Sequence, residues 1–446
     1  MPIKERIYCR GATRADIDAF GRVIDNAFGR SRVHNTGPAL AASIHDLEYI
    51  RLACHDHDGT EEILGACPIR DYPCHYGPMM LKCGGLSLVG VDPAYQRKGV
   101  GQALLANAEN FLHAKGYDMC MLFTGSPNFY RHQGWELCVE TYFCIIPAVK
   151  IPAIPAGSKR AADKITVRPC TPADRLAIQA LYEAFNKNRP LTRFRDDDWW
   201  SRSFSRDPPW FKNVIVATAS DLVAGYARAR LVPVPAPYAL RYTEEPRVDI
   251  TEYGVLPSKL PNLQRQIELE LLAGIKAMAF EQGFPIIGTP LPGTYPMSNY
   301  LRSAGATLKD AFLSSRMVQI VNMQLFLAKL LRFQENIVIL GVPRDRWKSL
   351  GPFKIGLAVE DVRGKEPVII RYTSDGTAVR VDIDPSKRPS TLVAVSRKLL
   401  GVMTMGNSLP SDLVEGDLWA CPAGLVPTLD ALFPNFKIIV YDGDNF

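Results

Sequence analysis

The stretch from Gly84 to Trp135 decides the fold and reads GGLSLVGVDPAYQRKGVGQALLANAENFLHAKGYDMCMLFTGSPNFYRHQGW. It predicts a short apolar strand over residues 86–91, a turn at Asp92-Pro93, and a basic glycine loop over residues 96–101. A helix follows, and its apolar residues recur on one face: Leu104, Ala108, Phe111. A strand is therefore joined to a helix through a loop that contains glycine.

A junction of this kind leaves backbone N–H groups free at the positive end of the helix, which suits a pyrophosphate. Gly99 and Gly101 let the backbone come close to such a ligand, and Arg97 and Lys98 add positive charge. Glycine loops also occur in plain turns and in other nucleotide folds. The loop alone therefore leaves a generic nucleotide site open.

The residues around the loop narrow the choice. The spacing Gln96-x-x-Gly99-x-Gly101, between such a strand and such a helix, resembles the acetyl-CoA loop of the GCN5-related N-acetyltransferases (GNAT). Residues 117–123 are predicted as the next strand, and residues 128–135 are similar to the late helix-turn of that family. The resemblance implies a GNAT fold of mixed α/β (α+β) class that binds acetyl-CoA.

Length and composition set the outer limits. The chain has 446 residues, which predicts two or three domains, with 47% hydrophobic and 22% charged residues. The net charge of +6 is a mild excess, so no nucleic-acid partner is indicated. No apolar run reaches the length of a membrane span, and the first residues lack the apolar core of a signal peptide. A cytoplasmic protein is expected.

The cysteines do not indicate a metal site. The sequence has 10 of them without a Cys-x-x-Cys pair, so reduced thiols are expected. One metal-like cluster, CHDHD over residues 54–58, lies between strands predicted over residues 49–54 and 63–68. No second ligand pair has a matching spacing, so a solvated hairpin turn is favoured and no metal is expected.

The chain repeats itself after a proline-spaced connector over residues 146–158. One set of residues recurs at a constant offset: Ile7, Arg10, Thr13 and Asp16 as Ile165, Arg168, Thr171 and Asp174. Ala27-Phe28 recurs as Ala184-Phe185, a strand pair returns over residues 214–230, and residues 128–134 recur as 299–305. These matches predict a catalytic GNAT domain over residues 1–150 and a second GNAT-like domain over residues 151–315.

The second copy differs where chemistry is expected. Its counterpart of the glycine loop, VLPSKLPN over residues 255–262, has no Gly-x-Gly and contains two prolines that cannot donate N–H groups. Leu301 stands in place of Tyr130. The copy is predicted to fold like the first and to bind no CoA. Its run Asp196 to Trp200 is interpreted as a solvated helix start with a buried Trp, not as an acidic amine pocket.

A third domain is predicted over residues 316–446. Strands are expected over residues 317–321, 353–359, 368–372 and 378–383, and helices over residues 325–331, 399–405 and 425–432. This order favours a small α+β domain. Residues 436–441 are predicted to form a strand or an extended arm, and residues 442–446 follow it.

The whole chain resembles one family. A GNAT domain with a CoA loop, a second copy without it, an α+β domain opening at MVQIVN and an ending in ALFP…F together resemble the Eis (enhanced intracellular survival) N-acetyltransferases. The resemblance implies tandem GNAT folds followed by a sterol-carrier-protein-like domain. It also implies acetylation of amines, including aminoglycosides, and assembly as a hexamer.

The resemblance assigns the site residues. In that family a tyrosine of the helix-turn acts as acid and the carboxylate of a C-terminal aromatic residue acts as base. Tyr130 and Phe446 occupy those positions. The same matching assigns the acetyl-CoA contacts to Val89, Gly90, Val91, Arg97, Lys98, Gly99, Val100, Gly101, Gln102, Gly125 and Ser126. Gln96 and Lys98 depart from the family's arginine-rich loop, so changed phosphate contacts are expected, not lost binding.

These residues predict direct attack of an amine on the acetyl-CoA thioester. Residues 89–91 are expected to splay from the neighbouring strand and offer an N–H to the thioester oxygen, and Gly90 suits that close approach. A bulge without a ligand is the alternative. Tyr130 would protonate the thiolate, which is uphill by roughly 2 kcal/mol for ordinary pKa values near 10 and 8.5. A packed aromatic residue is the alternative for Tyr130.

The base is harder to assign. An α-carboxyl and an alkylammonium differ by about 7 pKa units, or about 9 kcal/mol, so the Phe446 carboxylate suits orienting the amine better than deprotonating it unaided. Asp442 and Asp444 would attract a cationic substrate, and a frayed terminus stays open. His113 and His132 are further candidate bases by residue type.

The predicted function is an acetyl-CoA-dependent N-acetyltransferase. Its substrate is predicted to be a cationic small molecule with a primary amine, aminoglycoside-like or polyamine-like. Two alternatives remain, a protein lysine acetyltransferase and a non-catalytic protein that carries CoA or an apolar ligand.

Overall fold

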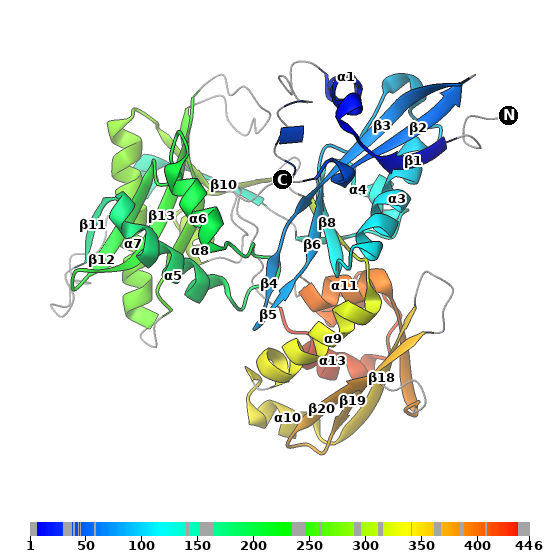
Figure 1. Ribbon diagram of the computed structural model, residues 1–446. Helices are drawn as coiled ribbons and strands as arrows, with labels where there is room; N and C mark the ends of the chain where they lie inside the picture. Colours follow the sequence, from blue (N-terminus) through cyan, green and yellow to red (C-terminus); the bar gives the residue numbers. More distant parts are fainter. Residues whose placement is uncertain are drawn as a thin grey trace.

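Three lobes follow one another along the chain in the computed structural model (Figure 1). The structure describes residues 7–29, 38, 41–42, 44, 46–57, 59–139, 142–151, 165–233, 246–257, 261–289, 296–310, 315–339, 341–360, 367–383, 388–405 and 408–435. We call the lobes the first unit (residues 7–139 with strand β17), the second unit (residues 165–310 with strand β10) and the third unit (residues 321–435). Helices and sheets occur together in all of them, which confirms the mixed α/β class.

The first unit is built on a sheet with the order β1-β2-β3-β6-β8-β17-β9, and β7 pairs with β3. The strands are β1 Ile7–Gly11, β2 Ile50–His57, β3 Thr60–Asp71, β6 Cys83–Leu86, β7 Gly90–Val91, β8 Met119–Thr124, β9 Glu136–Val139 and β17 Ser315–Ile320. Neighbouring strand residues face opposite ways, so α1 (Ile17–Phe28) packs on the side of Ala66 and α3 (Val100–Ala114) on the side of Cys67. The predicted hairpin joins β2 to β3, where His57 pairs with Thr60, but residues 54–57 of the CHDHD cluster belong to β2 itself and Cys54 is buried, so this part of the cluster is strand and not a solvated turn.

The second unit repeats this sheet, in the order β11-β12-β13-β14-β15-β10-β16. Its strands are β10 Tyr142–Pro147, β11 Thr166–Pro169, β12 Val214–Ala219, β13 Leu222–Val232, β14 Arg247–Val255, β15 Ile286–Thr289 and β16 Thr307–Asp310. Its helices are α5 Arg175–Asn186, α6 Asp197–Ser205, α7 Pro261–Glu281 and α8 Pro296–Ser303. Asp196 accepts a bond from the Trp199 N–H at the start of α6, and Trp200 is buried, which confirms the predicted helix start.

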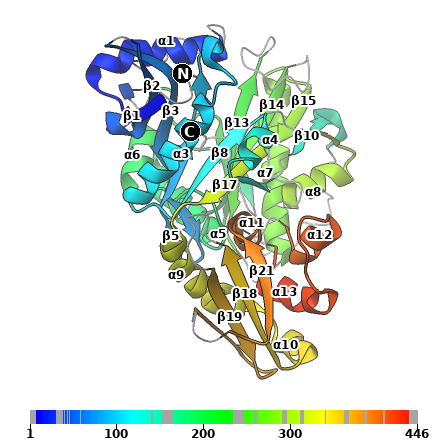
Figure 2. The same cartoon turned by 90° about the vertical axis from the view of Figure 1, so that its right-hand side faces the viewer.

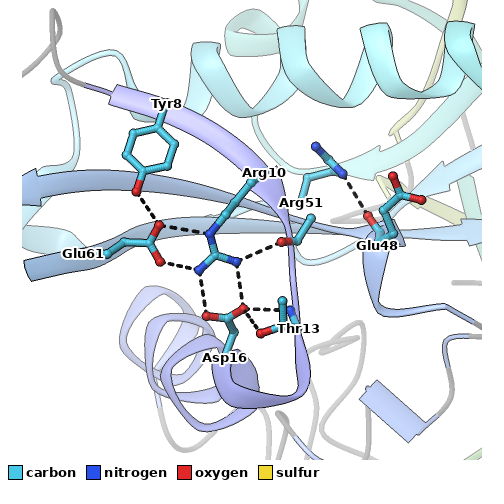
Figure 3. A network of polar contacts seen from close by, with 8 residues as sticks. Tyr8, Arg10, Thr13, Asp16, Glu48, Arg51 and Glu61 are labelled. Carbon is cyan, nitrogen blue, oxygen red and sulfur yellow. Dashed lines mark hydrogen bonds and ion pairs between the residues drawn. The ribbon is translucent and has the colours of Figure 1, made fainter.

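The duplicated residues form the same contacts in both units. Arg10 donates two bonds of 2.8 Å to the two oxygens of Asp16, and Asp16 Oδ2 also accepts the Thr13 N–H at 2.7 Å (Figure 3). The matching contacts of the second unit are Arg168 to Asp174 at 2.7 and 2.8 Å and Thr171 N–H to Asp174 Oδ2 at 2.8 Å. In each unit this carboxylate ties the first strand to the start of the first helix.

The two sheets exchange a strand. β17 lies between β8 and β9 of the first sheet, whereas β10 lies between β15 and β16 of the second. β10 precedes the expected boundary at residues 150/151 but belongs to the second sheet, and β17 begins at the expected boundary at residues 315/316 but belongs to the first. Of these two segments, only β17 was predicted as a strand, over residues 317–321, and the connector predicted over residues 146–158 begins inside β10. Periodicity carries no information about which sheet a strand joins.

The third unit has a sheet with the order β20-β19-β18-β21. Its elements are α9 Met323–Phe333, α10 Arg344–Leu350, β18 Phe353–Glu360, β19 Val368–Ser374, β20 Val379–Ile383, β21 Thr391–Ser396, α11 Arg397–Met405, α12 Pro410–Glu415 and α13 Val426–Leu432. Its core continues into the first unit, where Tyr76 stacks on Phe333 at 4.2 Å between centroids. Figure 2 shows α11 beside β17, and the two elements are in contact. Residues 436–446, including the predicted arm, lie outside the described residues.

Within the described residues, no helix combines the length and apolar character that crossing a membrane requires. All ten cysteines are described, and all are free thiols.

Candidate active site

A gap between strands opens in the first sheet beside the glycine loop. β6 pairs in parallel with β8 from Cys83–Met119 to Leu86–Leu122, and the pairing stops there. β7 pairs with β3 instead. The strand predicted over residues 86–91 is therefore interrupted, because Leu88 adopts φ +45° and leaves the ladder. Residues 87–91 lie free of β8, as the expected splay requires.

Gly90 was expected to let a ligand approach the backbone, and the structure shows that it lies against α1. A Cβ at Gly90 would lie 3.1 Å from Ala27 Cβ and from Ile24 Cδ1, and 3.2 Å from the Phe28 ring. These atoms all belong to α1. The glycine therefore lets α1 pack closely on β7, and its predicted contact with acetyl-CoA stays a prediction.

The glycine loop shapes the start of α3. Gly99 is the residue before the helix and has φ +89°, and Arg97 has φ +61°. The Ala103 N–H bonds the Gly99 carbonyl oxygen at 3.0 Å. The N–H groups of Val100, Gly101 and Gln102 precede it and have no acceptor within the helix, because a helix bonds four residues back. The loop therefore directs several donors to one place at the positive end of α3.

The charged side chains of the loop behave differently. Lys98 Nζ donates to the Ala94 carbonyl oxygen at 2.8 Å and lies 5.1 Å from the centre of the Tyr95 ring. Gln96 Nε2 donates to the Val91 carbonyl oxygen at 3.2 Å. The side chains of Gln96, Arg97 and Lys98 are all exposed, and those of Lys98 and Gln96 bond to backbone carbonyl oxygens and thus brace the loop.

The helix-turn predicted to carry the acid lies against this loop. It forms α4 (Pro127–Arg131), and a Cβ at Gly101 would be 3.1 Å from the Phe129 ring. Gly101 therefore makes room for an aromatic residue that is itself 39% exposed. Phe129 is not among the predicted site residues, although its place beside the candidate tyrosine was a signal for it.

Tyr130 is buried beneath Phe129. Its side chain is 9% exposed, and its ring meets the rings of Phe129 and Trp135 edge to face, at 5.0 and 6.2 Å between centroids. Burial raises the pKa of the Tyr130 phenol well above its ordinary value. Proton transfer from this phenol to a thiolate is therefore more uphill than the ordinary pKa values imply, unless the thiolate is desolvated too.

The structure separates the remaining candidates. Gly125 and Ser126 are exposed between β8 and α4, and the Ser126 N–H donates to Thr124 Oγ1 at 2.8 Å. His132 is exposed at the end of α4. His113 lies in the last turn of α3, about 20 Å along the helix from the loop at 1.5 Å per residue. Phe446 lies outside the described residues.

Two cavities lie in the second unit, and neither contains a predicted site residue. One, of about 460 Å³, lies between α7 and α8. The other, of about 630 Å³, lies beyond α6 and is lined by Arg206, Lys212, Arg228 and Arg230 with a single acidic side chain, Asp207. Its positive lining disfavours a cationic amine.

Residues 9–138 match the family model described as an acetyltransferase (GNAT) domain. No curated protein sequence matches the chain. Among solved structures, a GCN5-related N-acetyltransferase from Anabaena variabilis has a TM-score of 0.70 at 15% identity and covers 97% of this chain and 98% of its own. A probable N-acyltransferase from Enterococcus faecalis has a TM-score of 0.68 at 15% identity, with 98% and 99% covered. Eis1 from Mycobacterium abscessus has a TM-score of 0.61 at 14% identity, with 99% and 100% covered.

The chain thus carries a GNAT acetyltransferase domain over residues 9–138, which supports the predicted enzyme class, a GNAT N-acetyltransferase. The solved structures share the fold of the whole chain. The expected resemblance to Eis proteins is confirmed at the level of the fold, which an Eis1 protein shares over the whole chain.

Proposed function

We propose that this enzyme transfers the acetyl group of acetyl-CoA to a primary amine of a cationic small molecule, aminoglycoside-like or polyamine-like. One observation carries the proposal. The free donors of α3, the splayed residues 87–91 and Tyr130 meet in the first unit, and the second unit lacks this combination.

The residues present fit acetyl-CoA, which supplies an acetyl group activated as a thioester. The N–H groups of Val100, Gly101 and Gln102 would hold the pyrophosphate, with the exposed Arg97 adding charge. The remaining predicted contacts, Val89 to Val91, Gly125 and Ser126, line the splay and the start of α4. Lys98 would contact a phosphate only after leaving the Ala94 carbonyl oxygen.

In the proposed reaction Tyr130 is the acid. The amine nitrogen forms the new bond to the acetyl carbon as the carbon–sulfur bond breaks, and the Tyr130 hydroxyl gives its proton to the departing sulfur. The phenolate then recovers a proton from solvent. Because the pKa of the Tyr130 phenol is raised, the proton moves from Tyr130 to sulfur late in the reaction, when the negative charge on sulfur is fully developed.

We infer from the family resemblance that the Phe446 carboxylate orients the amine and receives its proton once attack has made the nitrogen acidic. Extending the chain by one residue beyond Phe446 tests this role. Turnover is expected to fall while acetyl-CoA still binds, and unchanged turnover would remove Phe446 from the mechanism.

We also propose, from the same resemblance, that the third unit is a sterol-carrier-protein-like domain within residues 316–446 and that the enzyme assembles as a hexamer. The proposed catalytic and silent GNAT domains keep the ranges 1–150 and 151–315, apart from the exchanged strands. Sedimentation velocity at micromolar protein would reveal a hexamer, and a monomer would contradict the assembly.

An assay of CoA release with a panel of acceptors tests the substrate class. Aminoglycosides or polyamines are expected to support turnover. Release with lysine peptides alone would favour a protein acetyltransferase instead. CoA binding without release in the presence of any amine would favour a carrier.

A further inference from the structure

A polar bridge joins the turn behind Tyr130 to α3 and to the third unit. Gln319, on β17, donates from Nε2 to the Gln133 carbonyl oxygen at 3.0 Å and to Glu109 Oε2 at 3.3 Å. Arg397, the first residue of α11, donates to Glu109 Oε1 at 2.7 Å. Gln319 is 3% exposed and Arg397 6%, so the bridge lies in the interior, where polar contacts are strong.

The bridge reaches Tyr130 through the backbone. The N–H of Gln133 donates to the Tyr130 carbonyl oxygen at 2.8 Å, so a fixed Gln133 holds the peptide group of Tyr130 as well. Gly134 follows with φ +87°, and a Cβ there would lie 3.1 Å from Gln319 Nε2. The glycine thus provides the space that the Gln319 amide occupies.

A second contact from the third unit holds the same turn. Glu136 accepts bonds of 2.8 Å from Lys398 Nζ and from Nε of Arg131, the last residue of α4. Burial acts to raise the pKa of Glu136, but the bonds from Lys398 and Arg131 outweigh it and hold the pKa below its ordinary value. Glu136 is therefore charged at neutral pH and anchors α4.

The second unit lacks the bridge at the corresponding positions. Gly116 and Gly283 both end their helices with φ +72°, and this match places Lys276 where the first unit has Glu109. Lys276 donates elsewhere, to the Ile151 carbonyl oxygen at 2.6 Å.

The positions that match Gln319 and Gly134 also lack the bridge in the second unit. Gln319 pairs with Cys120 on β8, and its counterpart Ile146 pairs with Ile287 on β15. Gly305, the counterpart of Gly134, has φ +91°, and among the described residues no atom lies within 4 Å of a Cβ built on it. The fold therefore forms this turn without a polar bridge. The bridge occurs in the first unit, which has Tyr130 at this turn, and not at the matching positions of the second, which has Leu301.

We propose that Gln319 is a positioning residue for Tyr130, so that the C-terminal part of the chain helps to place the acid of the first unit. The inference rests on the proposed role of Tyr130. Without Gln319, the Tyr130 turn loses its bond to β17 and, with it, the link through Gln319 to Glu109 on α3, so the hydroxyl is less well placed toward the departing sulfur. A misplacement of about 1 Å is enough to slow an enzyme by up to 10²-fold.

The variant Gln319→Leu tests this inference in the full-length enzyme with acetyl-CoA and an active amine. We expect kcat to fall about tenfold with little change in the KM for acetyl-CoA, because the loop is untouched. In a Tyr130→Phe background the same substitution should have no further effect, because Gln319 acts through the hydroxyl. An equal loss in both backgrounds, or no loss in either, would overturn the inference.

Two controls separate positioning from stability. Lys329→Met removes another ion pair between the third and first units, at 2.5 Å from Asp118, and should leave kcat within about twofold because it does not touch the Tyr130 turn. Gly134→Ala and Gly305→Ala carry similar backbone strain, but only the first meets Gln319. Lower kcat for Gly134→Ala alone supports the inference even if Gln319→Leu folds poorly, and equal kcat for the two glycine variants contradicts it. Failure of the wild-type enzyme to transfer acetyl groups would instead refute the proposed function.

Discussion

The two sheets of this enzyme have the same strand order, yet the corresponding helices α3 and α7 begin at different points. α3 starts 16 residues before Gly116, whereas α7 starts 22 residues before the matching Gly283. Measured from this glycine, α7 begins six residues earlier than α3, which moves the free N–H groups by about 9 Å along the helix axis at 1.5 Å per residue. The second unit therefore keeps the strands of the fold, but the earlier start of α7 removes the arrangement of N–H groups that would bind an anion.

The space beside the fourth strand differs as well. β14 is continuous, and its Glu252 corresponds to Leu88, the residue that interrupts the strand in the first unit. Glu252 accepts two bonds of 2.8 Å from Arg195 and one of 2.7 Å from Tyr226, and Arg195 and Glu252 have no exposed side-chain surface. The second unit fills with its own side chains the region that the first leaves open.

The largest expected effect concerns the tyrosine. Tyr130→Phe should lower kcat by about 10²-fold or more, because it removes the proposed proton donor but keeps the packed ring. The reciprocal change, Leu301→Tyr, should give no new activity, because the second unit lacks the loop and the splay. Steady-state assays of both variants measure the difference, and full activity of Tyr130→Phe would exclude the acid role.

A smaller effect is expected at the start of α3. Gly99→Ala places a side chain at φ +89°, which costs about 1–2 kcal/mol and distorts the donors, so the KM for acetyl-CoA should rise about tenfold. Gly116→Ala is the matched control, because Gly116 has φ +72° at the other end of the same helix. It should lose similar stability with an unchanged KM. Equal KM values for the two variants would remove the loop from the CoA site.

The smallest expected effect is on the free energy of unfolding, when the Asp of either Arg–Asp pair is replaced by Asn. The bond from Arg168 lowers the pKa of Asp174 to about 2, below its unfolded value near 3.9, so the pair stabilises the fold above pH 4 and ceases to do so as the pH falls to 2. Because Arg168 is 43% exposed, Asp174→Asn should cost only about 1 kcal/mol at pH 7.

The matching change Asp16→Asn should cost somewhat more, because the bond from Arg10 lowers the pKa of Asp16 further and Arg10 is 29% exposed against 43% for Arg168. Urea midpoints at pH 7 and pH 3 measure both variants, and the difference between each variant and the wild type should shrink on acidification. A constant difference would contradict the assigned pKa of Asp174.

Local sequence predicted the elements well and their partners poorly. The glycine loop, the β2–β3 hairpin and the start of α6 follow from residue spacing alone, and the structure contains all of them. Pro261 was interpreted as a lost donor. It is the first residue of α7, a position that needs no donor, and the early helix start is what differs.

Contacts between residues far apart in the chain could not be predicted from local residue spacing. Gly90 has the appearance of a ligand-approach glycine, and only the position of α1 shows what it meets. Gln319 lies in an ordinary apolar strand, 186 residues from the carbonyl oxygen that it bonds. Neither spacing nor composition brings such distant residues together.

The exchanged strands also affect how the protein is made. β9 follows β8 closely in the chain, but in the described residues its strand partner is β17, which leaves the ribosome only after the whole second unit. At 5–20 residues per second that delay is about 10–40 s. During this time β8 exposes an unpaired edge, a surface prone to aggregation. The first unit expressed by itself would keep that edge indefinitely, so the catalytic unit depends on synthesis continuing through β17.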